Sequence, residues 1–359
     1  STNVKTSNLA TGLSDKVGQS KNIIINGAMQ VAQRNTSSTD NGYGTVDRFR
    51  VSYSGTDEAP TQAQHALTSS DTGPWEKGFT YSYHITNGNQ TSGAGTADYI
   101  NPKQLIEAQN IANSGWNYTS TSSYITISFW VKSSVAQNFY GNIRTNDGTD
   151  YNYVWETGSL SADTWTKITK TIPGNSNLQF DNDTGNGLEV YPVRCFDGTD
   201  RTASMSLDTW GAHSNSSRTP DCTSTWYTTN DATLEFTGVQ LEVGDTATEF
   251  EHRSYAQELE LCKRYFQFVP PTLGEAQNTT NIQGCLTASP VMRASPTCAI
   301  VIASNNINLA GAGPKTCASI GSIHYNSTSG GWTEMGGTSF TAERNYYILP
   351  NAFSFSAEL

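Results

Sequence analysis

The stretch EFTGVQLEVGDTATEFEHRSYAQELELCKRYFQF, Glu235–Phe268, joins two different periodicities with almost no spacer between them. Its first part alternates with the period of two that is typical of a β-strand. The two predicted faces of this strand are Leu234, Phe236, Gly238 and Gln240 on one side, and Glu235, Thr237, Val239 and Leu241 on the other.

From Tyr255 the period changes to that of an amphipathic helix. The positions i, i+4, i+7 and i+11 are occupied by Tyr255, Leu259, Cys262 and Phe266, and the apolar surface is widened by Leu261, Tyr265 and Phe268. We therefore predict a helix from about residue 255 to 268. It carries more apolar surface than one edge of a single domain covers.

The composition predicts a mainly β protein with few, short helices. Only 15% of the 359 residues are charged, against about 25% in ordinary globular chains. Asn, Thr, Ser and Gly replace the charges, together with 17 Tyr and 8 Trp. Thr, Tyr and Trp favour pleated, half-buried surfaces, whereas Asn and Gly favour turns.

The net charge and the cysteine spacing argue against nucleic-acid binding and against a cysteine metal site. The net charge of −11 disfavours nucleic acid as a partner. We find no apolar run long enough to cross a bilayer and no secretory leader, so membrane insertion is not expected. The six cysteines form no metal-binding spacing. We expect free, mostly buried thiols and assembly in a reducing compartment.

Alternating segments predict a β-sandwich. In Ser123–Ser134, the residues Ile125, Ile127, Phe129 and Val131 share one face. Thr164–Pro173 reads as an inner strand facing it. Asn101–Gly115 is predicted as a short helix, because Pro102 suits a first turn and Gly115 a stop. Pro270 and Pro271 interrupt the pattern, and short strands follow to Leu359.

Several segments in order resemble a family of bacteriophage and prophage tail-fibre proteins. The matching stretches are NIIINGAMQVAQR, TVDRFR, IEAQNIANSG, ITISFWVKSS, TWTKITKTIPG, DNDTGNGLEV, FTGVQLEVGDTATEFEHRSYAQELELCKRYF, VMRASPTC and FSFSAEL, from Asn22 to Leu359. The family commonly has Trp after the Asp-Arg pair, where this chain has Phe49. The resemblance implies a jelly-roll sandwich like that of carbohydrate-binding modules, a short connecting helix and a small C-terminal β domain.

The resemblance also implies an organisation and a setting. The expected parts are a linker or virion-attachment segment at 1–21, the jelly roll at 22–250, the connecting helix at a trimer axis at 251–270 and a β tip domain at 271–359. The implied location is the virion tail fibre, assembled in the bacterial host cytoplasm. Implied partners are copies of itself, other tail proteins through the N-terminal segment, and a host cell-surface glycan.

The family's fibres are threefold, so we expect a parallel homotrimer. Closed symmetry would cover the apolar helix by repeating one contact around an axis. The expected interface residues are Tyr255, Leu259, Cys262 and Phe266.

Aromatic residues in loop-like segments are the predicted glycan contacts, because sugars stack their apolar faces on aromatic rings. The candidates are Trp116, Tyr118, Tyr151, Tyr153, Trp155, Trp210, Trp226 and Tyr227. Trp130 and Trp165 are interpreted as core residues.

Catalytic and metal signals are weak. No histidine lies in a metalloprotease motif or beside a nucleophile elbow. Glu107, Glu156 and Glu189 are the carboxylates from which a glycosidase pair could be drawn. The loop Asp181–Gly187 lacks the spacing of an EF-hand. We predict no catalytic residue, no bound metal and no cofactor, with a structural Ca²⁺ kept open.

The preferred hypothesis is a non-enzymatic receptor-binding protein of a phage tail fibre. Two alternatives stay open: a structural connector or adaptor of the virion, and a carbohydrate-binding module of a secreted glycosidase. Cell-binding assays separate the first two, and the oligomeric state separates both from the third.

Overall fold

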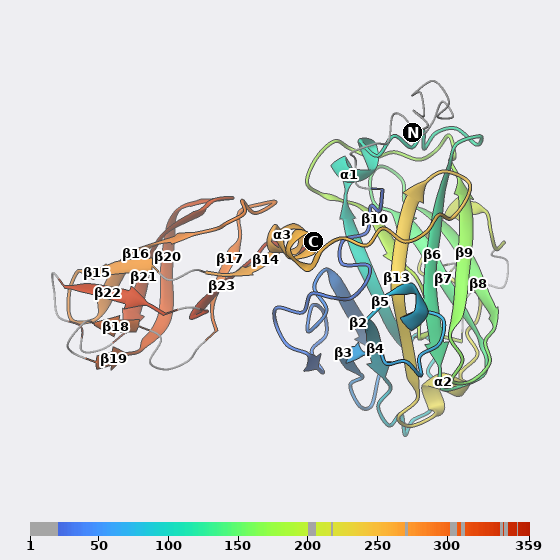
Figure 1. Ribbon diagram of the computed structural model, residues 1–359, viewed down its shortest axis with the longest axis horizontal. Coiled ribbons are helices and arrows are strands. Elements are labelled where there is room, and N and C mark those ends of the chain that lie inside the picture. Colours follow the sequence, from blue (N-terminus) through green and yellow to red (C-terminus); the bar gives the residue numbers. More distant parts are fainter. Residues whose placement is uncertain are drawn as a thin grey trace, which may run out of the picture.

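The protein folds into two bodies joined by a short helix, as the computed structural model shows (Figure 1). The structure describes residues 21–199, 206–216, 218–269, 272–301, 307–309, 313–337, 340, 344–349 and 351–359. Of the expected attachment segment at 1–21, only Lys21 is among them.

Two antiparallel sheets form the larger body. Sheet A has six strands in the order β1 (Ser37–Ser38), β3 (Thr61–Ala66), β4 (Tyr81–Thr86), β13 (Thr233–Val243), β6 (Tyr124–Ser133) and β9 (Thr166–Pro173). Sheet B has the order β11 (Phe196–Asp197), β5 (Tyr99–Glu107), β10 (Asn186–Tyr191), β7 (Asn138–Thr145), β8 (Tyr151–Ser159) and β12 (Trp210–Ala212), with β2 (Phe49–Ser54) also on β5. The predicted mainly β, sandwich-like architecture is confirmed.

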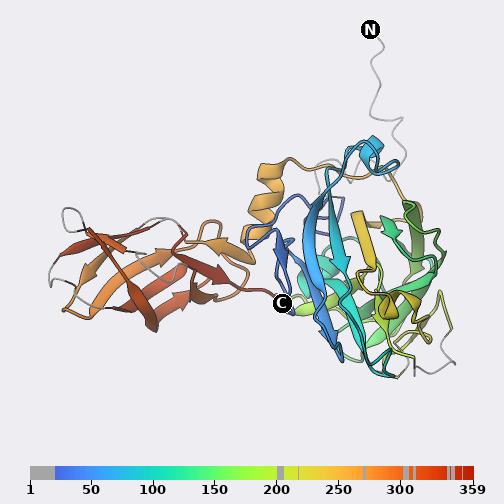
Figure 2. The same ribbon diagram turned by 90° about the horizontal axis from the view of Figure 1, so that it is seen from below.

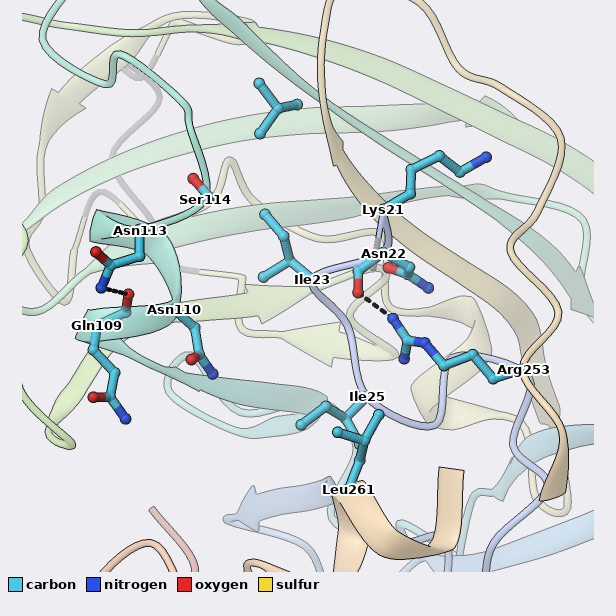
Figure 3. A pocket seen from close by; sticks show the side chains of 11 residues that line it. Lys21, Asn22, Ile23, Ile25, Gln109, Asn110, Asn113, Ser114, Arg253 and Leu261 are labelled. Atoms are coloured by element: carbon cyan, nitrogen blue, oxygen red, sulfur yellow. Dashed lines mark hydrogen bonds between the residues drawn. The ribbon is translucent and has the colours of Figure 1, made fainter. Parts of the chain in front are cut away.

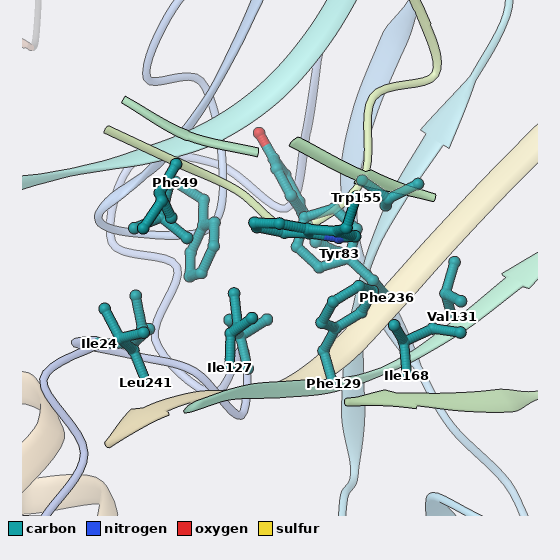
Figure 4. Packing of buried hydrophobic residues seen from close by; sticks show 14 of the residues in the cluster. Ile24, Phe49, Tyr83, Ile127, Phe129, Val131, Trp155, Ile168, Phe236 and Leu241 are labelled. Atoms are coloured by element: carbon teal, nitrogen blue, oxygen red, sulfur yellow. The ribbon is translucent and has the colours of Figure 1, made fainter. Parts of the chain in front are cut away.

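One hydrophobic core fills the space between the two sheets (Figure 4). Ile127, Phe129 and Val131 of β6 lie in it with no exposed surface, as their alternation predicts. Trp155 of β8 faces them from sheet B. The expectation that Thr164–Pro173 faces β6 across the sandwich is wrong, because β9 pairs with β6 within sheet A.

A β-bulge at Gly238 changes the predicted faces of β13. The register with β6 shifts between Thr237 and Gln240, and Gly238 has φ +64°. An added Cβ there would lie 2.6 Å from the Phe79 ring. The bulge reverses the alternation, so the core receives Leu234, Phe236, Val239 and Leu241. A strict period of two does not anticipate this.

The helices are short, and two of the predicted ones need correction. The first half of Asn101–Gly115 is strand, because β5 continues to Glu107, and only α1 (Ala108–Ala112) is helical. Strand β5 has partners on both sides, β2 and β10, and their hydrogen bonds override the local helix signals. The other helical turns are η3 (Trp75–Lys77) and α2 (Thr225–Thr228).

Helix α3 (Tyr255–Lys263) is also shorter than predicted. It begins with a capping box between Ser254 and Gln257. It ends at Lys263 because the chain turns into a strand, β14 (Phe266–Phe268), which pairs with β23 (Phe353–Ser356). Phe266 therefore belongs to a sheet and not to a helix stripe.

The smaller body contains two further sheets (Figure 2). Sheet C has the order β14, β23 and β17 (Thr297–Ile300). Sheet D has the order β19 (Gly313–Lys315), β18 (Ile307–Leu309), β22 (Asn345–Ile348), β15 (Thr272–Ala276), β16 (Asn281–Thr287), β21 (Gly330–Gly337) and β20 (Cys317–Ser327). A separate core that includes Met335, Tyr346 and Phe353 holds these sheets together.

A buried polar joint connects the two bodies. The Arg48 guanidinium is 1% exposed, stacks 3.4 Å from the centre of the Tyr265 ring and pairs with Glu358. Arg34 lies 3.7 Å from the centre of the Phe266 ring and 3.1 Å from Glu358. Two of the motifs that carry the family resemblance, TVDRFR and FSFSAEL, thus meet here.

Candidate ligand-binding pocket

The aromatic residues predicted to bind glycan are mostly core residues. Trp155, Trp226 and Tyr227 have no exposed surface, and Trp116 and Tyr153 are each 3% exposed. The remaining three, Tyr118, Tyr151 and Trp210, are half-buried and pack against the same core. The prediction is wrong for the five buried rings, because loop aromatics fold back onto the sandwich and Tyr151–Trp155 is part of β8.

The predicted trimer residues divide into two groups. Cys262 is 1% and Phe266 is 7% exposed within the single chain, so placing them at an axis between subunits is wrong. Tyr255 is 56% exposed and Leu259 is half-buried. These two residues remain available to another copy.

A small polar pocket lies on the outer face of sheet B. Its volume is about 170 Å³, and it is lined by Ser52, Tyr99, Asn101, Lys103, Arg144, Tyr191, Arg194, His213 and Arg218. Strand alternation directs the lining residues of β2, β5, β7 and β10 outward, whereas Arg194, His213 and Arg218 lie outside the strands. Ile100 and Ile106 of β5 face the core, so Asn101 and Lys103 point away from it. Arg144 is the outward neighbour of the buried Ile143 on β7.

The lining contains four cations and, among its described residues, no carboxylate. The carboxylates lie beside the pocket and orient the cations. Lys103 Nζ is 2.8 Å from Glu189, and Arg194 and Arg218 lie 3.1 and 2.6 Å from Asp197. A fourth pair joins Arg144 to Asp150.

Glu189 is ionised in this arrangement. Burial alone would raise its pKa, but the Lys103 ammonium, the Tyr191 hydroxyl and the Arg144 guanidinium hold the pKa of Glu189 below its ordinary value. The same pairing keeps Lys103 fixed at the edge of the pocket. The four cations and the three carboxylates beside them, Glu189, Asp150 and Asp197, leave one positive charge in excess at the pocket, in a chain whose net charge is −11.

Tyrosine rings support the guanidinium groups. Arg194 stacks with its Cζ 3.8 Å from the centre of the Tyr191 ring, and Arg218 lies 5.2 Å from the centre of Tyr99. Arg194 Nε also donates to Asn142 Oδ1 at 2.7 Å. Stacking of this kind fixes the plane of a guanidinium group. Arg218 also donates from Nε and Nη2 to Asp197 at 2.9 and 2.6 Å.

Two buried polar atoms in the pocket wall have no hydrogen-bond partner: Asn101 Oδ1 and His213 Nδ1. Burial lowers the pKa of His213 to about 4, and the Arg144 charge adds to this effect. His213 is therefore neutral near pH 7, with one ring nitrogen able to donate and the other able to accept.

The carboxylates considered for glycosidase chemistry do not form a pair of the required kind. Glu107 is fully buried and is held by the Tyr265 hydroxyl and by Arg264 at 3.1 Å. Glu189 is occupied by Lys103, and Glu156 is exposed on β8. Each has a separate structural environment.

A larger pocket of about 600 Å³ lies beside helix α3 (Figure 3). Its apolar wall includes Ile23, Ile25 and Leu261. Arg253 closes one side by donating to the backbone oxygen of Asn22. The pocket holds no set of convergent charges among the described residues and adjoins the part of α3 that remains open to another copy.

In the described part of the chain, one group of three residues lies close enough together to hold a metal ion: His65, His84 and Glu235 on sheet A. The loop considered for Ca²⁺ belongs to no such group. There, Asp183 accepts the Gly185 N–H at 2.8 Å, and Asp147 accepts the Asp181 N–H at 3.0 Å. These carboxylates act as turn-forming acceptors.

No known protein family matches the sequence, and no curated protein matches it. Among solved structures, the enzymatically active domain of tailspike protein 4 from bacteriophage CBA120 aligns over 62% of this chain and 21% of that one, at 12% identity and a TM-score of 0.33. The N-terminal cellulose-binding domain of a Cellulomonas fimi β-1,4-glucanase aligns over 61% and 99%, at 9% identity and a TM-score of 0.28. A family 22 carbohydrate-binding module of Clostridium thermocellum aligns over 60% and 97%, at 9% identity and a TM-score of 0.28. At these scores the likenesses establish no shared family.

Proposed function

We propose that this chain is the receptor-binding subunit of a phage tail fibre and that it binds a host surface glycan without cleaving it. The ordered motifs from Asn22 to Leu359 support the setting. The pocket on sheet B supports the binding activity. It offers charged and neutral hydrogen-bond donors, and its described lining contains no carboxylate.

The observation that carries the proposal is the charge of the pocket lining. Lys103, Arg144, Arg194 and Arg218 converge on about 170 Å³, which is below the roughly 300–1,000 Å³ of typical small-molecule sites. The space suits one sugar ring or one charged substituent and not a buried oligosaccharide. Arginine binds carboxylates through two parallel hydrogen bonds. We infer that the glycan carries an acidic sugar.

Replacing Arg144 with Gln is expected to raise the Kd for an acidic host polysaccharide about tenfold or more. A charge-assisted hydrogen bond contributes about 1.5–3 kcal/mol, and 1.4 kcal/mol corresponds to a factor of ten. Calorimetric titration measures the Kd. Lys170→Gln, which removes a cation from sheet A, is the matched control and should bind as the native protein does.

Two further titrations separate the parts of the proposal. Polysaccharide whose carboxyl groups have been reduced to alcohols should bind far more weakly. Equal binding of both forms would contradict the acidic sugar but leave glycan binding intact, whereas binding of neither would favour a structural connector. Steady release of fragments from the polysaccharide would show that the protein is an enzyme.

We also propose a homotrimer, now through the exposed part of α3. Tyr255 is 56% exposed and sits one turn before the half-buried Leu259. Leu261 adds an apolar wall at the adjacent pocket. Exposed apolar groups that gather on one helix are typical of an interface, and closed symmetry would cover all copies equally.

Changing Tyr255 and Leu259 together to Asp is expected to convert a trimer to monomers, because each copy would place two charges in an apolar contact. Light scattering measures the mass. Trp75→Asp alters another exposed aromatic residue, 41% exposed and outside α3, and should leave the mass unchanged. A native protein with the mass of one chain would contradict the trimer.

A further inference from the structure

The cluster of His65, His84 and Glu235 lies on the outer face of sheet A, on three adjacent strands. His84 of β4 is directly opposite Glu235 of β13. His65 of β3 is paired with Ser82, two residues from His84. Tyr83, Ile85, Leu234 and Phe236 face the core, so the three side chains share the opposite face.

We propose that His65, His84 and Glu235 form a binding site for a divalent transition-metal ion, Zn²⁺, with one coordination position open to solvent. Two imidazoles and one carboxylate are a ligand set that Zn²⁺ accepts, whereas Ca²⁺ and Mg²⁺ require more oxygen ligands. The open position follows from the number of protein ligands, which is three.

The distances suit such an ion. His65 Nδ1 is 3.0 Å from one Glu235 oxygen, and His84 Nδ1 is 3.3 Å from the other. All three ligand atoms lie within 4.8 Å of one another. Around a tetrahedral Zn²⁺ with bonds near 2.0–2.1 Å, ligand atoms lie about 3.3 Å apart. Small side-chain rotations therefore complete the site.

His84 is oriented in the way that metal-ligating histidines usually are. Its Nε2 hydrogen-bonds Thr86 Oγ1 at 3.1 Å, which fixes the ring by its other nitrogen. Its Nδ1 is buried, faces Glu235 and makes no well-formed hydrogen bond. An ion between Nδ1 and the carboxylate would satisfy this atom.

Lys132 is the competing cation. Its Nζ lies 3.1 Å from Glu235 Oε1 and 3.0 Å from Asp71 Oδ1. If the ion takes the Glu235 oxygen, Lys132 keeps Asp71, which the Trp165 N–H also holds at 3.0 Å. The Ser82 hydroxyl donates to Glu235 Oε2 at 2.7 Å and positions the carboxylate.

Solvent reaches the site from the side of His65. The His65 side chain is 50% exposed, whereas those of His84 and Glu235 are 19% and 4% exposed. A bound ion would therefore keep one water or one exchangeable external ligand. The site lies on sheet A, whereas the cationic pocket lies on sheet B, so the two are independent.

The test uses the full chain purified without a polyhistidine tag and freed of metal by a chelator. Calorimetry with Zn²⁺ should give one ion per chain, and Co²⁺ should give a visible spectrum of four-coordinate geometry. His84→Ala should weaken Zn²⁺ binding about 100-fold, while His252→Ala, at an exposed histidine outside the cluster, should not change it. Glu235→Gln provides a second variant, and circular dichroism confirms that each variant folds.

Three results would overturn the site: no saturable Zn²⁺ binding, binding that survives both His84→Ala and Glu235→Gln, or a Co²⁺ spectrum with a thiolate charge-transfer band. The last would assign the ion to a cysteine.

Discussion

Replacing Arg48 with Met is expected to lower the free energy of unfolding by up to about 3–5 kcal/mol, the cost of removing one partner from a buried ion pair. Arg48 is 1% exposed and pairs with Glu358, which is itself buried to 8% exposure. Its Nη2 also donates to the Leu105 carbonyl at 2.6 Å. The change leaves Glu358 with Arg34 alone and leaves that carbonyl without this donor.

Urea denaturation with a probe in each body measures the effect. Lys167→Met, which removes an exposed cation on β9, is the matched control and should stay within about 0.5 kcal/mol of the native protein. Glu358→Gln should destabilise the protein in the same direction, because it leaves Arg48 unpaired. An Arg48→Met protein as stable as the control would show that the joint does not depend on this pair.

The second large effect expected is that the free energy of unfolding depends on pH through the carboxyl group of Asp47. Burial raises the pKa of Asp47 to about 6, although hydrogen bonds from Gln33 and the charge of Arg34 oppose the rise. The folded protein thus binds this proton more tightly than the unfolded chain does. In the unfolded chain the pKa of Asp47 is 3.8. The resulting stability is complete below pH 3.8 and is lost as the pH rises through 6.

The free energy of unfolding of the native protein should therefore rise by about 2 kcal/mol relative to that of Asp47→Asn when the pH falls from 7 to 4. The comparison uses urea unfolding of both proteins at several pH values, with Asp40→Asn at an exposed carboxylate as the control. A difference between native protein and Asp47→Asn that is constant from pH 4 to 7 would contradict the prediction.

The sandwich could be predicted from the sequence because its strongest strand alternates cleanly. Every second side chain from Ile125 to Val131 lies in the core. A period of two is typical of a strand and does not fit a helix. The reversal in β13 could not be predicted, because it depends on φ at Gly238 and on the space beside Phe79. The end of α3 depends on pairing with β23, about 90 residues later in the chain.

The sequence pattern does not predict the candidate pocket, because the cations that line it are scattered along the chain. Its residues come from separated segments, such as Asn101, Arg144 and Arg218. A local signal did exist: polar Asn101 and Lys103 alternate with inward residues on β5. Yet only the packing of β5, β10 and β7 side by side brings these positions together.

The joint between the two bodies has a mechanical consequence. The chain leaves the sandwich through Phe266 and returns beside it, because Phe266 is paired with Ser356 and the Ala357 N–H bonds the Tyr265 carbonyl at 2.7 Å. Two antiparallel backbones therefore cross the joint, and the ion pairs of Arg34 and Arg48 clamp the returning one. A single backbone connection would let the smaller body rotate about it, whereas two connections resist that rotation. A force applied sideways to the smaller body is therefore transmitted to the sandwich through the joint.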